Sequence, residues 1–414
     1  MRRQERWLIL MARCLTLFAL AGAFLTLQGC GGGSSSSNSG GGGSSPPPVN
    51  NTQPVEVNPG PASSANELFV SITLCNSGTA TCQVIPDVLV DTGSTGLRIL
   101  RTQLTLSLTN TTDASGNPIG TCAQFADNTF AWGSVAKADV KMAGEVASSV
   151  PIQVIADPSV SNIPTDCSDN GKMTNLDTVA ALAANGILGI GLFAQDCGPG
   201  CAPGVMKVPP VYFSCPGSGC VATTLAVASQ LQNPVRLFPQ DNNGIMISLP
   251  AVAAGGSAIL DGSLIFGIGT QPDNALGSAK VYAVDQRGNF STVFNGTTYN
   301  MSFLDTGSNG LFFLDAATAG LPTCPAPNAS FYCPASTQNL TATNKGINGV
   351  SAPVPFSIAN ADSLFTNNNA ALGELGGPNA GAFDWGLPFF YGRTVFVAIE
   401  QTSTPGGPGP FWAY

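Results

Sequence analysis

The chain carries one acidic tetrapeptide twice. Asp-Thr-Gly-Ser occupies residues 91–94 and again 305–308, each time at the end of a short apolar run. The longer segments Asp-Thr-Gly-Ser-Thr-Gly-Leu and Asp-Thr-Gly-Ser-Asn-Gly-Leu differ at one position. Agreement of that length within one chain indicates duplication. We therefore interpret the two copies as halves of one site.

Two carboxyl groups in contact can do chemistry that one carboxyl cannot. Both cannot ionise together, so they share a proton and their pKa values separate. One carboxylate then takes a proton from water while the other carboxyl protonates a carbonyl oxygen, which hydrolyses an amide without a covalent intermediate. Asp91 and Asp305 are the candidate catalytic pair.

The residues after each aspartate suit this chemistry. Gly93 and Gly307 permit a tight turn that brings the backbone close to the carboxyl. The hydroxyls of Ser94 and Ser308 can donate to the outer carboxylate oxygens. The alternative is that each segment is only an Asx-type turn after a strand. A matched pair favours the catalytic interpretation.

The chain contains no histidine, and only 9% of its residues are charged. Catalytic triads that need imidazole and histidine zinc sites are therefore excluded. Carboxylate chemistry is the main catalytic option that remains, and we expect neither a cofactor nor a metal.

The N-terminal segment has the pattern of an export signal. Four arginines precede an apolar run that ends in Leu-Gln-Gly-Cys, which predicts a signal peptide over residues 1–29. The last four residues resemble a bacterial lipobox, and this would make Cys30 the lipidated N-terminus. With Gly31 rather than Asp next, the resemblance implies the outer membrane. An ordinary secretory signal, with Cys30 incidental, is the alternative.

A low-complexity stretch separates this signal from the body. Residues 30–65 are rich in Gly, Ser, Asn and Pro and predict a flexible tether. The remaining length suits two lobes better than one core. We assign the N-terminal lobe to residues 66–250 and the C-terminal lobe to 251–414.

Without Cys14 and Cys30, ten cysteines remain, an even number that predicts disulfides in an exported protein. Zinc binding by Cys197 and Cys201 is a minor alternative. Local spacing predicts the pairs Cys75 with Cys82, Cys215 with Cys220, and Cys324 with Cys333, and leaves Cys122, Cys167, Cys197 and Cys201 unassigned.

The formal net charge is −9. Removal of residues 1–29, which hold four Arg and one Glu, leaves −12 for the mature chain. A surface of this sign does not attract phosphates, so we expect no nucleic-acid partner.

Strand patterns dominate the body, and 49 Gly and 31 Pro indicate many turns. Two Ala-rich segments, residues 176–185 and 221–231, are the better helix candidates. The clearest strand candidates are residues 67–74, 139–142, 150–155, 244–249 and 394–399. The pattern predicts an all-β protein with a few short helices.

Together these segments resemble the bilobal pepsin-like aspartic proteases over about residues 66–414. Besides the paired Asp-Thr-Gly-Ser motifs, residues 185–191 and 384–390 resemble the two segments that run beneath the catalytic loops. Residues 130–134 resemble the first-lobe flap, and residues 262–267 the opening of the second lobe. The signature also resembles an uncharacterised family of proteobacterial lipoproteins.

The resemblance implies roles for individual residues and also exposes departures. Thr92 and Thr306 would lock the two loops together. Trp132 stands where the family's flap has Tyr, and Arg98 stands where it has Trp near the first loop. We expect these two side chains to form a cation–π pair in the substrate cleft. Asp384 also replaces an apolar residue before Gly386.

The sequence therefore predicts an exported, lipid-anchored aspartic endopeptidase that acts as a monomer on peptides or unfolded proteins. The lipid bilayer is expected as a partner through Cys30. Two alternatives stay open. One is a catalytically inactive pepsin-like envelope lipoprotein that binds extended peptide or polysaccharide, and the other is a purely structural envelope protein.

Overall fold

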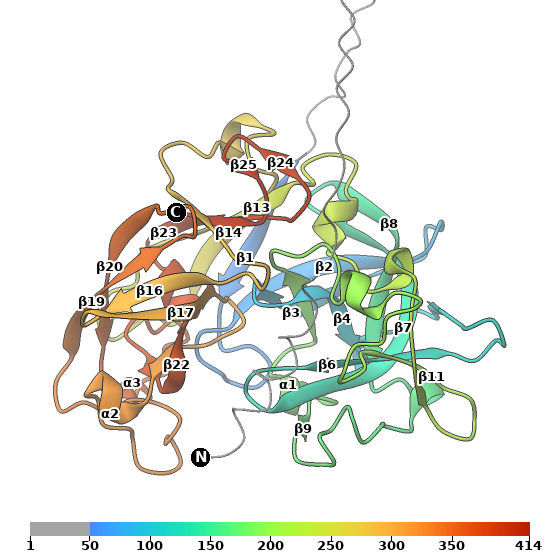
Figure 1. Cartoon of the computed structure of the whole chain (residues 1–414), viewed down its shortest axis with the longest axis horizontal. Coiled ribbons are helices and arrows are strands. Elements are labelled where there is room, and N and C mark those ends of the chain that lie inside the picture. Colours follow the sequence, from blue (N-terminus) through green and yellow to red (C-terminus); the bar gives the residue numbers. More distant parts are fainter. Residues whose placement is uncertain (1–49) are drawn as a thin grey trace, which may run out of the picture. The chain divides into compact units, whose positions relative to one another are not determined.

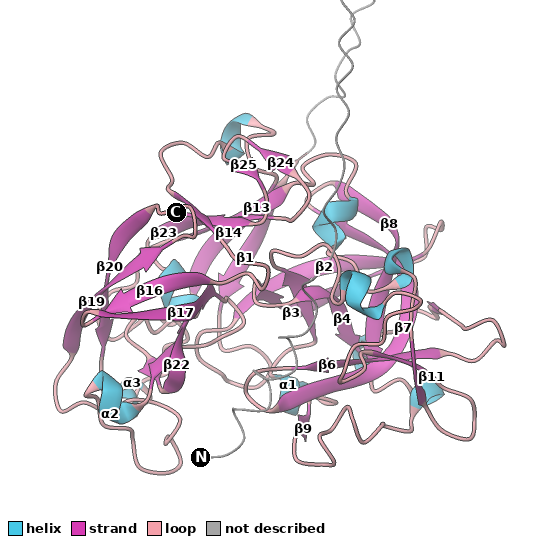
Figure 2. Cartoon of the chain, viewed as in Figure 1, coloured by secondary structure: helices cyan, strands magenta, loops and turns pink. Residues whose placement is uncertain are grey.

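Strands form almost all of the regular structure in the computed structural model, which describes residues 50–414 (Figures 1 and 2). The predicted signal peptide, Cys30 and most of the tether lie outside the described residues. In that described part, no helix is long and apolar enough to cross a membrane. The all-β class and the two-lobed arrangement are confirmed.

One sheet of 17 strands contains the first lobe and extends into the second. Its strands are β1 (Thr52–Val57), β2 (Leu68–Asn76), β3 (Cys82–Asp91), β4 (Thr95–Leu100), β5 (Thr109–Asn110), β6 (Ile119–Gln124), β7 (Thr129–Met142), β8 (Glu145–Ile155), β9 (Thr174–Asn175), β10 (Gly186–Ile190), β11 (Tyr212–Ser214), β12 (Val221–Thr223), β13 (Gly244–Leu249), β14 (Leu260–Phe266), β15 (Val281–Ala283), β23 (Arg393–Ala398) and β26 (Phe411–Ala413). All five clear strand candidates are confirmed, three of them within β7, β8 and β13 and two mostly within β2 and β23.

A second sheet of seven strands, together with three one-turn helices and a two-stranded ribbon, completes the regular structure (Figure 1). The sheet holds β16 (Phe290–Phe294), β17 (Thr297–Leu304), β18 (Leu311–Leu314), β19 (Gln338–Lys345), β20 (Ser351–Ile358), β21 (Gly376–Gly377) and β22 (Asn379–Trp385). The ribbon is β24 (Ser403–Thr404) with β25 (Gly407–Pro408), and the helices are α1 (Val179–Leu182), α2 (Ala316–Ala319) and α3 (Ala361–Leu364).

The two Asp-Thr-Gly-Ser loops stand on the same three-strand arrangement. In the first lobe β10 runs parallel to β3 and antiparallel to β4. In the second lobe β22 runs parallel to β17 and antiparallel to β18. Residues 185–191 contain β10, and residues 384–390 begin with the last two residues of β22, so each segment includes at least part of the strand between the two strands of its loop. This repeated frame fixes the direction of both loops.

The tether prediction is wrong at its C-terminal end. Residues 52–57 form β1, which pairs antiparallel with β14 along its whole length and with the start of β2. Val55 and Val57 lie on one face and are buried in the main core. These alternating valines outweighed the neighbouring Pro and Asn residues in the sequence, because a sheet edge was available to pair with them.

The lobe boundary at residue 250 does not coincide with a sheet boundary. It falls between β13 and β14, which pair antiparallel, and β13 also pairs with β23 near the C-terminus. Strands from both ends of the chain thus share one sheet with first-lobe strands. The β14 segment, expected to open the second lobe, lies in this shared sheet.

The two helix predictions fare differently. Residues 176–185 contain only the single turn α1, which Thr178 caps by accepting from the Ala181 amide. The prediction of a helix over 221–231 is wrong, because this segment begins with β12 and continues with a 3-10 turn, Val227–Ser229. Pairing of β12 with β11 overrides the weak helical preference of its alanines.

Five disulfides join all ten cysteines of the body. The three pairs expected from spacing are present: Cys75–Cys82, Cys215–Cys220 and Cys324–Cys333. The unassigned four form Cys122–Cys167 and Cys197–Cys201. The sulfurs of the second pair are thus bonded to each other rather than free to hold zinc.

Candidate active site

Two aspartates from different lobes lie at adjoining loops. Asp91 is the last residue of β3, and Asp305 directly follows β17. The apolar residues before them, Val90 and Leu304, are fully buried and anchor the strand ends. Asp91 is buried, whereas Asp305 keeps intermediate exposure. The frame described above therefore delivers both carboxyls to one place.

The two threonines interlock the loops reciprocally. The Thr92 amide donates to Thr306 Oγ1 at 3.1 Å, and the Thr306 amide donates to Thr92 Oγ1 at 3.0 Å. The hydroxyls then donate onward across the pseudo-dyad, Thr92 to the Leu304 carbonyl at 3.2 Å and Thr306 to the Val90 carbonyl at 2.6 Å. Four hydrogen bonds thus fix one loop against the other in a buried setting.

Each glycine faces the aspartate of the opposite loop. A Cβ on Gly93 would lie 2.6–2.7 Å from the carboxyl atoms of Asp305, and one on Gly307 would lie 2.9 Å from Asp91 Oδ1. Real Cβ contacts are not that short, so any side chain would push the carboxyls apart. Close approach of backbone and carboxyl explains why glycine occupies both positions.

Hydrogen-bond donors converge on both carboxyls. Asp91 Oδ1 accepts from the amides of Gly93 at 2.8 Å and Ser94 at 3.1 Å, and its Oδ2 accepts from the Ser94 hydroxyl. Asp305 Oδ1 accepts from the Gly307 amide at 2.8 Å, and its Oδ2 lies 3.0 Å from Ser308 Oγ. Each serine reaches the outer oxygen of its own aspartate, as expected.

A third carboxyl belongs to the second loop. Asp384, on β22, is 9% exposed, and its Oδ2 lies 2.6 Å from Ser308 Oγ. The sequence showed that Asp384 replaces an apolar residue, but assigned it no role. Its partner, Ser308, is 76 residues away. Only the parallel pairing of β17 with β22 reveals that they meet.

The pKa values of Asp305 and Asp384 are both raised. Burial is the main cause that raises the pKa of Asp305 well above its usual value, and the nearby Asp91 and Asp384 carboxyls add to it. The hydrogen bonds from Gly307 and Ser308 act in the opposite direction. Burial likewise raises the pKa of Asp384 to about 7. The cluster therefore retains protons at a pH where an isolated carboxyl is ionised.

A cavity of about 250 Å³ adjoins the first loop. Its floor includes Gly93 and Ser94, and its wall includes Arg287. The apolar part of the lining comes from Leu192, Phe193, Phe303, Leu304 and Trp412. Space for a small group thus exists beside the first loop, although neither Asp91 nor Asp305 lines it. Nothing in the sequence pattern singled out Arg287, which lies within a surface turn.

The predicted pair Trp132 and Arg98 is wrong. Trp132 is buried in a separate cluster, where its indole donates to the Val160 carbonyl and its ring lies edge-on to Phe213. Arg98 is also buried, and donates to Gln153 Oε1 at 3.0 Å. Among the described residues, a cation–π contact is made instead by Arg393, which lies over the Phe389 ring. Both side chains satisfy first-lobe core groups instead of forming a substrate cleft.

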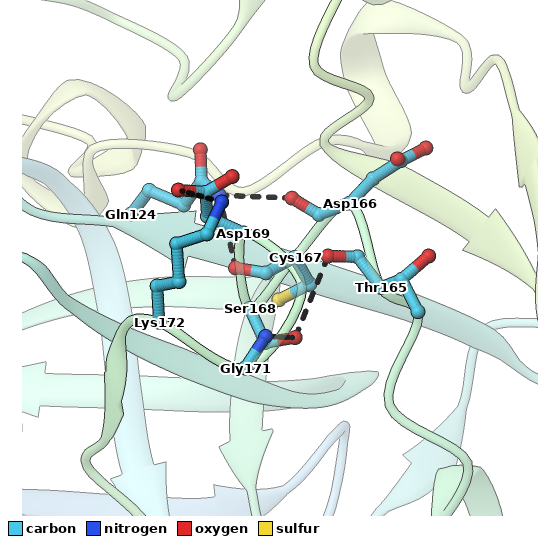
Figure 3. A network of polar contacts seen from close by, with 8 residues as sticks. All are labelled: Gln124, Thr165, Asp166, Cys167, Ser168, Asp169, Gly171 and Lys172. Carbon is cyan, nitrogen blue, oxygen red and sulfur yellow. Dashed lines mark hydrogen bonds and ion pairs between the residues drawn. The ribbon is translucent and has the colours of Figure 1, made fainter. Parts of the chain in front are cut away.

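The hairpin of β6 and β7, which contains Trp132, is tied to a neighbouring loop (Figure 3). Gln124, at the end of β6, donates to the carbonyls of Asp166 at 3.0 Å and Cys167 at 2.9 Å. The Cys122–Cys167 disulfide fixes the same strand to the same loop. On its other edge β6 pairs with β11. The hairpin is therefore held on two sides.

One other group of metal-type ligands occurs in residues 50–414, formed by Cys324, Cys333 and Asp362. The two sulfurs are already joined in a disulfide, so this group does not offer three ligands. The aspartate cluster is accordingly the site with a chemical interpretation.

Comparisons place the chain among uncharacterised proteins. No curated protein matches it. A solved structure, the aspartic proteinase from Irpex lacteus, matches with a TM-score of 0.49 and 13% sequence identity, covering 87% of this chain and 96% of that chain. A family model described as protein of unknown function (DUF3443) matches residues 47–414. The chain therefore belongs to the DUF3443 family.

Proposed function

We propose that the protein is an aspartic endopeptidase in which Asp91 and Asp305 activate water against a peptide bond. The observation that carries this proposal is the reciprocal lock of Thr92 and Thr306, which holds the two aspartate loops together. A protein that needed only a β-scaffold would gain nothing from this arrangement, because two neighbouring carboxyls partly removed from water cost stability.

The surroundings of the two aspartates suggest a division of labour. Asp91 accepts three hydrogen bonds from its own loop, and we assign it the role of the base. The raised pKa of Asp305 makes it the holder of the shared proton and the acid. Water bound between them loses a proton to Asp91 as Asp305 protonates the carbonyl oxygen. The cycle closes when Asp91 passes its proton to the leaving amine and Asp305 regains a proton from a hydroxyl of the tetrahedral intermediate.

The substrate class follows from the reaction and the adjoining cavity. Attack by water on an amide needs an extended backbone laid across both carboxyls, with side chains to either side. The cavity beside Gly93, with its mixed apolar and polar lining, can take one such side chain. Unfolded protein or flexible peptide is therefore the proposed substrate.

The proposed location is the outer membrane, reached by export and lipid anchoring at Cys30. Five disulfides support an oxidising compartment. The lipobox-like sequence before Cys30 supports the anchor. We expect Cys30→Ser to move the protein from the membrane fraction to the aqueous phase on detergent partitioning. If wild type and variant both stay aqueous, the anchor assignment is wrong.

Cleavage of casein between pH 3 and 7, with and without pepstatin, tests the activity. Wild-type protein should give a bell-shaped, acid-side profile, because the pair must be singly protonated. Asp91→Asn and Asp305→Asn should each reduce turnover at least ~1000-fold. Asp261→Asn is the matched control, because this aspartate is exposed on β14. Full activity in either site variant would contradict the proposal.

A second candidate function is peptide binding without cleavage. The observation that favours it is the β6–β7 hairpin, which the Cys122–Cys167 disulfide and Gln124 hold in place. The resemblance makes this hairpin the flap over the substrate, and such a flap must open for substrate exchange. Wild-type protein that binds pepstatin or a peptide with a measurable Kd, yet leaves the peptide intact at every pH, would favour this alternative.

A further inference from the structure

A serine hydroxyl lies between two carboxyl groups at the second Asp-Thr-Gly-Ser loop. Ser308 Oγ is 3.0 Å from Asp305 Oδ2 and 2.6 Å from Asp384 Oδ2. A hydroxyl has one proton, so it can donate to only one of these oxygens. The other contact is a hydrogen bond only if that carboxyl is protonated and donates to Ser308 Oγ. The geometry therefore requires a proton on Asp305 or on Asp384.

The environment of Asp384 identifies it as the holder of this proton. Its Oδ1 is buried and, within residues 50–414, has no hydrogen-bond partner. A bare buried oxygen costs much less in a neutral acid than in a carboxylate. In the neutral form, Oδ2–H donates to Ser308 while Oδ1 is an ordinary carbonyl oxygen. Ser308 is then free to donate to Asp305.

The groups around Asp384 support the same assignment. Its partners on the flanking strands are Phe303 and Phe312, which carry no charge. The titratable groups that act on it are Asp91 and, across Ser308, Asp305. No described lysine or arginine lowers the pKa of Asp384, which burial and the Asp91 charge raise to about 7.

We propose that Asp384 holds a reserve proton that reaches Asp305 through Ser308. In the transfer, Asp384 Oδ2 gives its proton to Ser308 Oγ while Ser308 gives its hydroxyl proton to Asp305 Oδ2. One O–H bond breaks and one forms at Ser308, and the negative charge moves from Asp305 to Asp384. The Asp91–Asp305 pair thereby stays singly protonated to a higher pH than two carboxyls alone would.

This inference rests on the proposed peptidase function and is tested first by the pH profile. In Asp384→Asn the amide can still donate to Ser308 Oγ, but it has no proton to transfer. We expect turnover within about twofold of wild type near pH 4 and a basic limb about one pH unit lower, hence a roughly tenfold loss on that limb. Asp261→Asn, exposed on β14, should leave the limb unmoved. A uniform loss at all pH values, or an unchanged profile, would overturn the proposal.

A titration without turnover separates this inference from the peptidase proposal. In wild-type protein labelled with ¹³C at the aspartate carboxyls, NMR should show a carboxyl that titrates near pH 7 and disappears in Asp384→Asn. Asp305 should lose its proton at lower pH in that variant. In Ser308→Ala the titrations of Asp384 and Asp305 should become less coupled. This second variant keeps the proposal testable if Asp384→Asn misfolds. If Asp384 titrates near the ordinary value of about 4, the proposal is wrong even where peptide is cleaved.

Discussion

The two aspartate loops share a backbone frame but differ in charge. The strand registers make Ile187 and Asp384 equivalent, since they pair with Leu89 and Phe303, two residues before the aspartate of each loop. On the other side, Ile187 lies opposite Arg98 and Asp384 lies opposite Phe312. The first lobe thus puts its charge on the loop's exit strand, and the second puts it on the central strand.

This difference shows that some loop residues are required by the shared backbone frame, whereas the charge beside each loop can differ between the lobes. The glycines and the interlocked threonines are the same in both loops, because they determine how closely the carboxyls approach. The charge at the flanking positions is not fixed by the frame. Arg98 serves the first-lobe core, whereas Asp384 extends the carboxyl cluster. The second loop is therefore the half in which acid–base behaviour can be tuned.

The largest effect after loss of an aspartate should come from the glycines, where the frame tolerates least. Gly93→Ala places Cβ against all three carboxyl atoms of Asp305, and we expect at least ~100-fold loss of turnover because a carboxyl must move. Gly307→Ala should cost less, about tenfold, since its contacts at 2.9–3.1 Å are longer. Gly217→Ala, with nothing within 4 Å, is the control. Equal activity of Gly93→Ala and the control would disprove this reading of the contact.

Loss of either interlocking hydroxyl should destabilise the fold. Thr306→Val leaves the Thr92 amide and the Val90 carbonyl without their partner, at a cost of about 2–4 kcal/mol. Thr92→Val removes the equivalent pair and should cost a similar amount. Thr121→Val is a matched control, because this buried hydroxyl has no hydrogen-bond partner within residues 50–414 and its loss should not lower the free energy of unfolding.

Urea unfolding of the double variant then tests whether the two threonines act as a unit. We expect the combined loss to be smaller than the sum of the single losses, because loss of one hydroxyl already loosens the loop against which the other hydroxyl makes its bonds. Strict additivity would show that the two hydroxyls stabilise their loops independently.

The sequence predicted the part of this site that lies in contiguous motifs. The aspartates, their turns and the segments beneath them were recognisable because each is a short run with its own composition. The three short-range disulfides followed from spacing. The contact between Ser308 and Asp384 could not be predicted, because it depends on the register of two strands far apart in the chain.

The wrong predictions have a common physical origin in contacts with other segments of the chain, which local composition does not show. Trp132 and Arg98 were placed in the cleft because they depart from the family's residues, yet both satisfy polar groups inside the first lobe. A buried arginine whose donors bind a glutamine and a carbonyl gives no local sequence signal. Likewise β1 and β12 are strands because neighbouring edges pair with them, which a composition count does not detect.

Arg98→Met tests the charged position of the first lobe. It removes the donors to Gln153 Oε1 and to the Thr95 carbonyl, and we expect a loss of about 2–3 kcal/mol in the free energy of unfolding. The same change at exposed Arg287 should alter stability by no more than ~0.5 kcal/mol. Comparable stability of the two variants in urea would mean that the buried guanidinium is not needed for the fold.

The pH dependence of stability isolates the charged position of the second lobe. The pKa of Asp384 is about 7 in the folded protein, against 3.8 for an unperturbed aspartate. Between these values the folded state keeps a proton that the unfolded state has lost, so stability falls as pH rises from about 4 to about 7. The slope from one proton is at most about 1.4 kcal/mol per pH unit.

Glu67 and Glu145, with raised pKa values of about 8 and about 7, add slopes of the same sign. Subtracting the free energy of unfolding of Asp384→Asn from that of wild type cancels these contributions. If Asp384 is responsible, wild type should gain stability relative to the variant as the pH falls from about 7 to about 4. A difference that does not vary with pH would mean that Asp384 is ionised throughout, and the two loops would then differ in packing but not in protonation.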